Sequence, residues 1–128
     1  MTALLDTHTI LWSGRAQHRL GLGARAILKE ESSVLLVSSA SAWEIATKVR
    51  LGKFPEAAVL EADFVLLMGK AGFHLLSISV EDALRAGRMQ GQHRDPFDRM
   101  IAAQALALDI PVISIDTKLD AFGVRRIW

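Results

Sequence analysis

Four acidic side chains in this sequence stand where carboxylates could act together. Asp6 follows the apolar run 2–5, and Asp116 follows the apolar run 111–115, in the matching contexts ALLDT and ISIDT. Both runs predict strands, and ligands of open α/β sheets bind at the carboxyl ends of the strands. Each aspartate alone could simply cap the turn or helix after it. Because Asp6 and Asp116 occur in the same local context, a single site formed by both side chains is favoured.

The segment 38–53, SSASAWEIATKVRLGK, places a third acid near the same edge. Ser41 and Glu44 have the S-x-x-E spacing of a capping box, and Lys48 stands four residues after Glu44, where a surface ion pair is ordinary. Capping alone would account for Glu44. Yet this helix begins directly after a strand, so Glu44 on its first turn would lie beside the other two acids.

The segment 93–106, HRDPFDRMIAAQAL, contains two aspartates with different expected roles. Asp95 precedes Pro96, a residue preferred at the first helical position, so Asp95 is expected to be the N-cap. Asp98 shares a helix face with the apolar residues three and four positions later, so its carboxylate should face the sheet. A carboxylate in that position is costly unless it is paired or bound to a cation.

Crowded carboxylates repel one another, and a divalent cation relieves the repulsion. Mg²⁺ and Mn²⁺ take oxygen ligands, keep several waters and bring in substrate phosphates. Such an ion can activate a water molecule and stabilise an in-line displacement at a phosphodiester. The four acids therefore indicate metal-dependent hydrolysis of a phosphate ester, in which no acid needs to act as a nucleophile.

The elements that must position these acids alternate along the chain. Strands are expected at 2–5, 34–37, 73–78 and 111–115, with a further edge strand in the final VRRIW. Helices are expected at 24–31, 42–51, 57–70, 80–89 and 96–108. This order, with strands that are nearly continuous in apolar character, predicts an α/β fold with a parallel sheet flanked by helices.

Composition narrows the class of protein. A chain of 128 residues is expected to form one domain over 1–128. It has no cysteine, which excludes disulfides and thiolate metal sites. It shows no signal-peptide pattern and no membrane span, so a cytoplasmic location is expected. The net charge of +1 means that a nucleic-acid role must rest on a local site.

Taken together, these segments resemble the PIN-domain ribonucleases, in particular the VapC-type toxins of bacterial and archaeal toxin–antitoxin pairs. The resemblance spans nearly the whole chain, because LLDTHTILW (4–12), the two acidic segments quoted above and PVISIDTKLDAFGVRRIW (111–128) stand in the family's order. It implies a PIN-like fold and an endoribonuclease that depends on Mg²⁺ or Mn²⁺ and leaves 5′-phosphate and 3′-hydroxyl ends. The family's catalytic and metal-binding acids fall on Asp6, Glu44, Asp98 and Asp116.

The same resemblance implies partners. It predicts a cognate VapB-like antitoxin that fills the active-site groove, an RNA substrate and a homodimer of the toxin. The hydrophobic fraction of 51% agrees with some apolar surface being covered by a partner. Ser114 matches a small hydroxyl position near the last acid.

Two other functions stay open. The stretch LDTHT could hold the aspartyl nucleophile of a phosphatase, but His8 stands where the second aspartate of such a site would be. The second alternative function is that of a non-catalytic PIN module that binds RNA or a protein. The presence of all four acids argues against it.

Several other residues are given structural or surface roles. The histidines have no shared metal-ligand spacing: His8, His18, His74 and His93. The three tryptophans are expected in the core. The segment 19–25, RLGLGAR, lacks the order of a phosphate-binding loop. Five basic side chains could steer a phosphate backbone toward the acids, or could equally form a solvated helix face: Lys48, Arg50, Lys53, Arg94 and Arg99.

Overall fold

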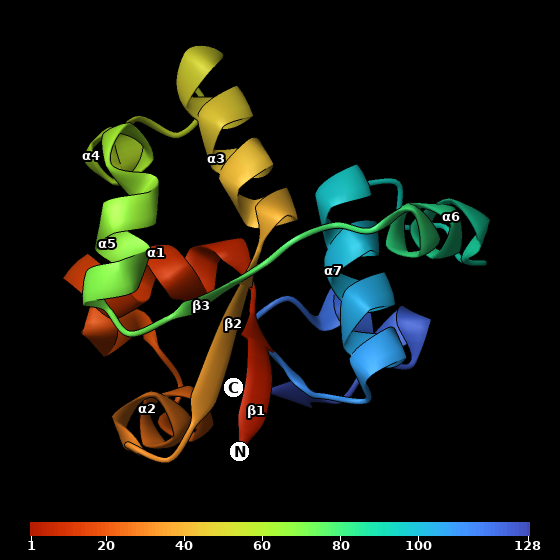
Figure 1. Ribbon diagram of the computed structural model, residues 1–128, viewed down its shortest axis with the longest axis horizontal. Coiled ribbons are helices and arrows are strands. Elements are labelled where there is room, and N and C mark those ends of the chain that lie inside the picture. The colour runs from red at the N-terminus through yellow and green to blue at the C-terminus, as the bar shows by residue number, and fades with distance from the viewer.

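Five parallel strands form the centre of the fold in the computed structural model, which describes residues 1–128 (Figure 1). They are β1 (Thr2–Leu5), β2 (Val34–Ser38), β3 (His74–Leu76), β4 (Val112–Ile113) and β5 (Arg126–Ile127). Their order across the sheet is β3-β2-β1-β4-β5, and every neighbouring pair is parallel. The α/β class with a parallel sheet is thereby confirmed, including the edge strand near the C-terminus.

Seven α-helices cover the two faces of this sheet. They are α1 (Thr7–Arg15), α2 (Leu22–Lys29), α3 (Ser39–Arg50), α4 (Ala58–Ala62), α5 (Phe64–Lys70), α6 (Val80–Arg88) and α7 (Pro96–Leu108). Short 3₁₀ helices span Gln17–Arg19, Pro55–Ala57 and Thr117–Phe122. Figure 1 shows α1, α2, α4 and α5 on one side of the sheet and α6 and α7 on the other, while α3 continues from the end of β2 beyond the edge of the sheet.

The central strand β1 is buried on both faces, which explains its unbroken apolar sequence. Ala3 and Leu5 belong to a cluster that includes side chains of α1, α2, α3 and α5. Leu4 points the other way and packs with Ile101 of α7 and Val112 of β4. Alternate residues of a strand point to opposite faces, so two cores share one sheet.

Helix α1 was not expected from the sequence. Its residues THTILWSGR contain β-branched side chains that have modest helix propensity. The helix forms because it buries Ile10, Leu11 and Trp12 against the sheet, and because the side chain of Asp6 caps its first turn. Tertiary burial here outweighs local preference.

Other boundaries also differ from expectation. The single helix expected over 57–70 is two helices, α4 and α5, separated at Asp63, whose backbone dihedrals of −127° and 37° are not helical. The strands expected over 73–78 and 111–115 are shorter, spanning His74–Leu76 and Val112–Ile113. Pairing with the neighbouring strands limits their length.

The glycines of RLGLGAR serve close packing against the C-terminus. A Cβ atom on Gly23 would lie 2.7 Å from the main-chain oxygen of Trp128, and one on Gly21 would lie 2.5 Å from its carbonyl carbon. Larger residues at these positions would force the C-terminal segment away from α2.

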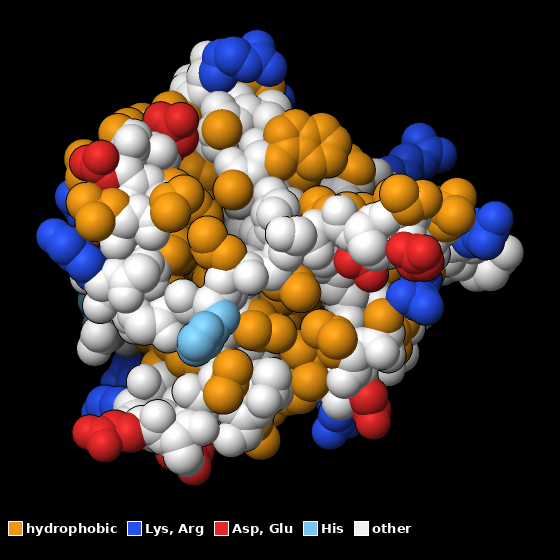
Figure 2. Space-filling view, viewed as in Figure 1, with side chains coloured by type: hydrophobic (Ala, Val, Ile, Leu, Met, Phe, Trp, Pro, Cys, Tyr) orange, Lys and Arg blue, Asp and Glu red, His pale blue; other side chains and the backbone are white.

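Many large hydrophobic side chains remain exposed, and Figure 2 shows such side chains spread over the face that carries α3, α5 and β3. Trp43 on α3 is 57% exposed, so the expectation that every tryptophan is buried is wrong for this one. Its ring meets Phe97 edge-on at 4.7 Å between centroids. No helix has the length and apolar character of a membrane span.

Candidate active site

The four acids that the sequence singled out line one pocket of about 200 Å³ at the carboxyl ends of the strands. Asp6 follows β1, Glu44 lies on the helix after β2, Asp98 lies in the first turn of α7, and Asp116 lies beyond β4. The pocket is also lined by His8, Lys48, His93, Asp95, Ile115 and Lys118. The expected convergence is therefore present, while the role of the acids as metal ligands stays a prediction.

Asp6 is held at the floor of this pocket, with 5% of its surface exposed. Its carboxylate accepts hydrogen bonds from the N–H of Thr7 at 2.7 Å and from the hydroxyl of Ser114 at 2.6 Å. The same hydroxyl oxygen accepts a hydrogen bond from the N–H of Asp116 at 2.9 Å. Ser114 thus ties the ends of β1 and β4 together.

Burial raises the pKa of Asp6, and the hydrogen bonds from Ser114 and Thr7 oppose this only in part. The negative charge of Glu44 raises the pKa further. The structure therefore places a carboxylate where its own charge is disfavoured unless a cation is near.

The capping box expected at Ser41 and Glu44 is wrong. Helix α3 begins three residues earlier, and its N-cap is Ser38, whose side chain accepts a hydrogen bond from the N–H of Ala40 at 3.0 Å. Glu44 consequently lies in the second turn rather than the first. Ser41 is inside the helix, with its hydroxyl 3.0 Å from that of Thr7.

Glu44 is buried and both of its carboxylate oxygens have partners. The hydroxyl of Thr7 donates to one oxygen at 2.5 Å, and the ammonium group of Lys48 pairs with the other. Burial opposes the charge on Lys48, but the hydrogen bond and charge of Glu44 outweigh it and raise the pKa of Lys48. Because the carboxylate is 5% exposed, this is not the surface ion pair that the spacing alone suggested.

Asp95 is the N-cap of α7, as the sequence predicted. Its side chain accepts hydrogen bonds from the N–H groups of Phe97 at 2.9 Å and Asp98 at 3.1 Å. Pro96 occupies the first helical position, where a missing N–H costs nothing.

Asp98 is a second carboxyl group of the pocket whose charge is disfavoured. Its side chain is 13% exposed, and Ile101 and Ala102 on the same helix face are fully buried. Burial, followed by repulsion from Asp6, raises the pKa of Asp98 to about 7, although a hydrogen bond with His93 lowers it. The expected sheet-facing orientation is confirmed, and the group resists ionisation when no cation is present.

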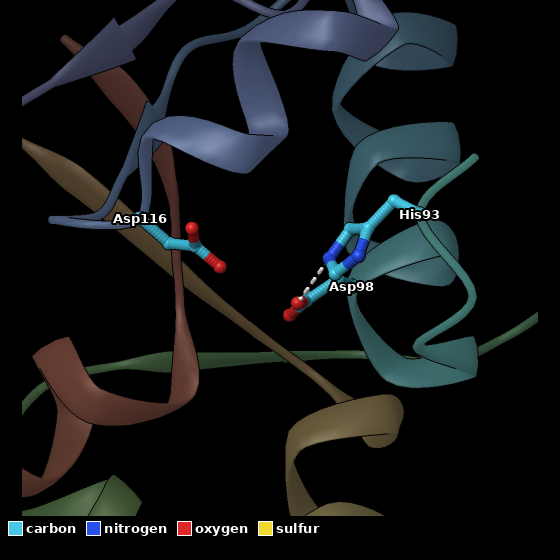
Figure 3. A group of neighbouring side chains, drawn as sticks. All are labelled: His93, Asp98 and Asp116. Carbon is cyan, nitrogen blue, oxygen red and sulfur yellow. Dashed lines mark hydrogen bonds and ion pairs between the residues drawn. The ribbon is translucent and has the colours of Figure 1, made fainter. Parts of the chain in front are cut away.

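His93 belongs to the site, although its spacing in the sequence indicated a structural or surface role. Its Nε2 lies 2.7 Å from Oδ2 of Asp98. A ring nitrogen of His93 and one carboxylate oxygen from each of Asp98 and Asp116 lie within 4.8 Å of one another, and Figure 3 shows the three side chains turned toward a common point. The sequence did contain one indication of this role, because His93 stands just before the segment DPFD, which contains Asp98. The spacing rules for zinc ligands do not take such a position into account.

These donors fit a divalent cation. Carboxylate oxygens are the ligands that Mg²⁺ and Mn²⁺ prefer. Burial raises the pKa values of both Asp6 and Asp98, and repulsion from Glu44 adds to the effect on Asp6 and repulsion from Asp6 to the effect on Asp98. Lys48 already neutralises Glu44, but no such ion pair neutralises Asp6. A bound cation would relieve the repulsion that remains among the other acids.

The sequence also matches a family model. The model described as PIN domain matches residues 3–124, and no curated protein sequence gives a significant match. Several solved structures share the fold. VapBC2 from Rickettsia felis, bound to a DNA fragment from its promoter, is 14% identical, with 98% of this chain and 97% of that chain covered and a TM-score of 0.69.

Two further structures are similar over most of their length. VapC20 of Mycobacterium tuberculosis, a toxin that cleaves the sarcin–ricin loop, is 17% identical, with 95% of each chain covered and a TM-score of 0.67. VapBC-1 from nontypeable Haemophilus influenzae is 20% identical, with 98% and 96% covered and a TM-score of 0.66. At these identities the likeness shows the fold, while the family model spans nearly the whole sequence, so the chain belongs to the PIN domain family.

Proposed function

We propose that this protein is a VapC-like toxin, a Mg²⁺- or Mn²⁺-dependent endoribonuclease that hydrolyses RNA phosphodiester bonds and is neutralised by a cognate antitoxin. The observation that carries the proposal is the convergence of four acids from four separate segments in one pocket. Membership of the PIN family and structural likeness to VapC toxins support it. The absence of cysteine agrees with action in the reducing cytoplasm, where RNA is available.

The side chains of the pocket have distinct proposed roles. Asp6, Glu44, Asp98 and Asp116 would hold the cation, which when bound supplies Lewis-acid activation of water and of the phosphate. Thr7 and Ser114 orient the carboxylates of Glu44 and Asp6 through their hydrogen bonds. Lys118 lines the pocket, and its ammonium group can attract the phosphodiester anion.

The phosphatase alternative is less well supported by the geometry. Both oxygens of Asp6 accept hydrogen bonds, and the side chain is nearly inaccessible. These bonds reduce its nucleophilicity and hold it away from a substrate phosphorus. The geometry therefore favours attack by water over formation of an aspartyl phosphate.

The test is cleavage of RNA by the purified protein. We expect cleavage with Mg²⁺ or Mn²⁺, loss of cleavage in EDTA, and products with 5′-phosphate ends. Asp6→Asn and Asp116→Asn should each lower the rate by orders of magnitude while circular dichroism shows a folded protein. Undiminished cleavage in EDTA would contradict the metal mechanism. A phosphoenzyme trapped from a small phosphomonoester would instead support the phosphatase. RNA binding that needs no metal and leads to no cleavage would support the non-catalytic module.

An antitoxin partner is proposed on the basis of the family and of exposed apolar surface. A groove of about 250 Å³ lies between α1 and the α4–α5 pair, and eight of its twelve lining residues are hydrophobic. An apolar tail that gains order on binding could occupy it. The product of the neighbouring reading frame should copurify with this protein and suppress its toxicity, and failure of both would contradict the proposal.

A toxin homodimer is proposed separately, since the exposed side chains of α3, β3 and α6 include Trp43, Leu75 and Val80. Light scattering of the purified protein should give twice the monomer mass of 14.0 kDa. A monomeric mass across the micromolar range would contradict the dimer.

A further inference from the structure

The loop between α6 and α7 is anchored so that His93 is held in the pocket. The guanidinium group of Arg99 donates hydrogen bonds to the carbonyl oxygens of Ala86 at 3.1 Å and His93 at 2.9 Å, and also to that of Met89. The ring of Phe122 lies 5.8 Å from the imidazole. Arg99 is therefore engaged in fixing this loop, and is not the free cation for phosphate that its position in the sequence suggested.

The anchored ring directs one nitrogen at the acids. The side chain of His93 is 16% exposed, and its Nε2 contacts Asp98 at 2.7 Å. A ring nitrogen of His93 also lies within 4.8 Å of a carboxylate oxygen of Asp116, and Figure 3 shows that the nitrogen hydrogen-bonded to Asp98 is the one on the side of Asp116. His93 lies in the loop just before α7, Asp98 in the first turn of α7 and Asp116 in the segment after β4, and the three side chains are directed at a common point (Figure 3).

A simple hydrogen bond between His93 and Asp98 does not account for this arrangement. Asp116 makes no hydrogen bond with His93 or Asp98, yet its carboxylate is directed at the same point as these two side chains. A divalent cation held by the three donors would compensate the charges of both carboxylates. Asp98, Asp116 and His93 would hold such an ion, and three protein ligands would leave room for water and substrate oxygens.

We infer that Nε2 of His93 is a direct ligand of the metal centre, together with the carboxylates of Asp98 and Asp116, and that this nitrogen makes the centre select Mn²⁺ over Mg²⁺. The inference rests on the metal centre of the proposed function and adds a ligand and a metal preference to it. Imidazole nitrogen suits transition metals, whereas Mg²⁺ takes oxygen ligands in nearly ideal octahedral geometry.

The experiment uses the full chain with Mn²⁺ alone as the probe. Pulsed electron paramagnetic resonance detects the nuclear coupling of a nitrogen bound directly to Mn²⁺, and it requires no substrate or activity. We expect this coupling in the wild type, and we expect it to change when the histidines are labelled with ¹⁵N. It should disappear in His93→Gln and persist in His8→Gln and His74→Gln. His8 lines the same pocket and is the competing source of nitrogen, and His74 is an exposed control on β3.

Metal titration provides the second measurement. In His93→Gln the Mn²⁺ affinity should fall by about tenfold or more, while the Mg²⁺ affinity should change much less. The ratio of the Mn²⁺ affinity to the Mg²⁺ affinity should therefore be smaller than in the wild type. If His93→Gln does not fold, the ¹⁴N and ¹⁵N spectra of the wild type together with the spectrum of His8→Gln still decide the question, because histidine coupling that persists in His8→Gln leaves His93 as the histidine of the pocket.

Three results would overturn the inference. They are Mn²⁺ binding without nitrogen coupling in the wild type, coupling that survives His93→Gln, and coupling that is lost in His8→Gln instead. A protein that binds no Mn²⁺ at all would overturn both this inference and the proposed metal dependence. Nitrogen coupling in a protein that cleaves no RNA would support the ligand while contradicting the proposed function.

Discussion

Asp95 and Asp98 are three residues apart at the start of α7, and their surroundings separate their roles. Asp95 accepts two backbone hydrogen bonds, whereas Asp98 is enclosed with apolar residues and faces Asp6 and His93. The carboxylate of Asp95 stabilises a helix, whereas ionisation of Asp98 lowers the stability of the metal-free fold. The same side-chain type thus has opposite effects on the stability of the metal-free protein.

Substitution should separate the two aspartates. Asp95→Ala should lower the free energy of unfolding by roughly 0.5–2 kcal/mol because two N–H groups lose their acceptor, and Asp95→Asn should largely restore it. Asp98→Asn should abolish cleavage and the stabilisation of the fold by Mn²⁺. Urea unfolding with and without Mn²⁺ measures both effects. The assignment is reversed if Asp95→Asn loses the Mn²⁺ effect and cleavage while Asp98→Asn keeps them.

The raised pKa of Asp98 predicts how pH affects the metal-free protein. The carboxyl has a pKa of about 7 when folded and about 3.9 when unfolded. Between these values the folded state binds more protons, so this group's contribution to stability is full below about pH 4 and is lost as pH rises through about 7. Burial raises the pKa of Asp6 and acts in the same direction.

In EDTA, the melting temperature of the wild type relative to that of Asp98→Asn should therefore fall between pH 5 and pH 8. The comparison with the variant removes the contributions of titrating groups that lie away from the pocket. A difference that is constant, or that increases with pH, would contradict the raised pKa.

At the scale of elements, three of the four acids stand at helix starts that face the pocket. Asp6 caps α1, Asp116 caps the 3₁₀ helix Thr117–Phe122, and Asp98 lies in the first turn of α7. The N-terminal ends of helices carry partial positive charge and exposed N–H groups, which favour anions. The strand ends bring these helix starts together, so the sheet determines the geometry of the acids.

The contact between α2 and the C-terminus gives a prediction for packing. Gly23→Ala should lower the free energy of unfolding by about 1–3 kcal/mol because the added Cβ would lie 2.7 Å from the oxygen of Trp128. Gly87→Ala is the matched control, since it lies within α6 with open space around it, and it should be neutral or stabilising by about 0.5–1 kcal/mol. Equal effects of the two substitutions in urea unfolding would contradict close packing at Gly23.

For the whole molecule, the two cores share the strands of one sheet, so we expect residues 1–128 to unfold as a single domain. Leu4 and Leu5 are adjacent in β1 yet belong to different cores, and neither core can separate without exposing this strand. Unfolding followed by tryptophan fluorescence and by far-ultraviolet circular dichroism should give coincident curves. Two separate transitions would contradict one cooperative domain.

Much of this protein was determined by the sequence itself. The apolar runs predicted the strands, Asp95 and Pro96 predicted the start of α7, and the acids after the apolar runs predicted the pocket. These features are local, since a strand buried on both faces needs an apolar run and a helix start needs a cap next to it. Local chemistry of this kind can be read along the chain.

Other features were decided only by the tertiary structure. Helix α1 forms because its apolar residues are buried, and Ser38 caps α3 because the strand ends there. His93 lies in the site because Arg99 donates a hydrogen bond to its carbonyl oxygen and so fixes its loop. Glu44 forms a buried ion pair with Lys48 because α3 packs beside α1. Each outcome depends on contacts between residues from different elements, and their energies depend on burial and distance that no local pattern specifies.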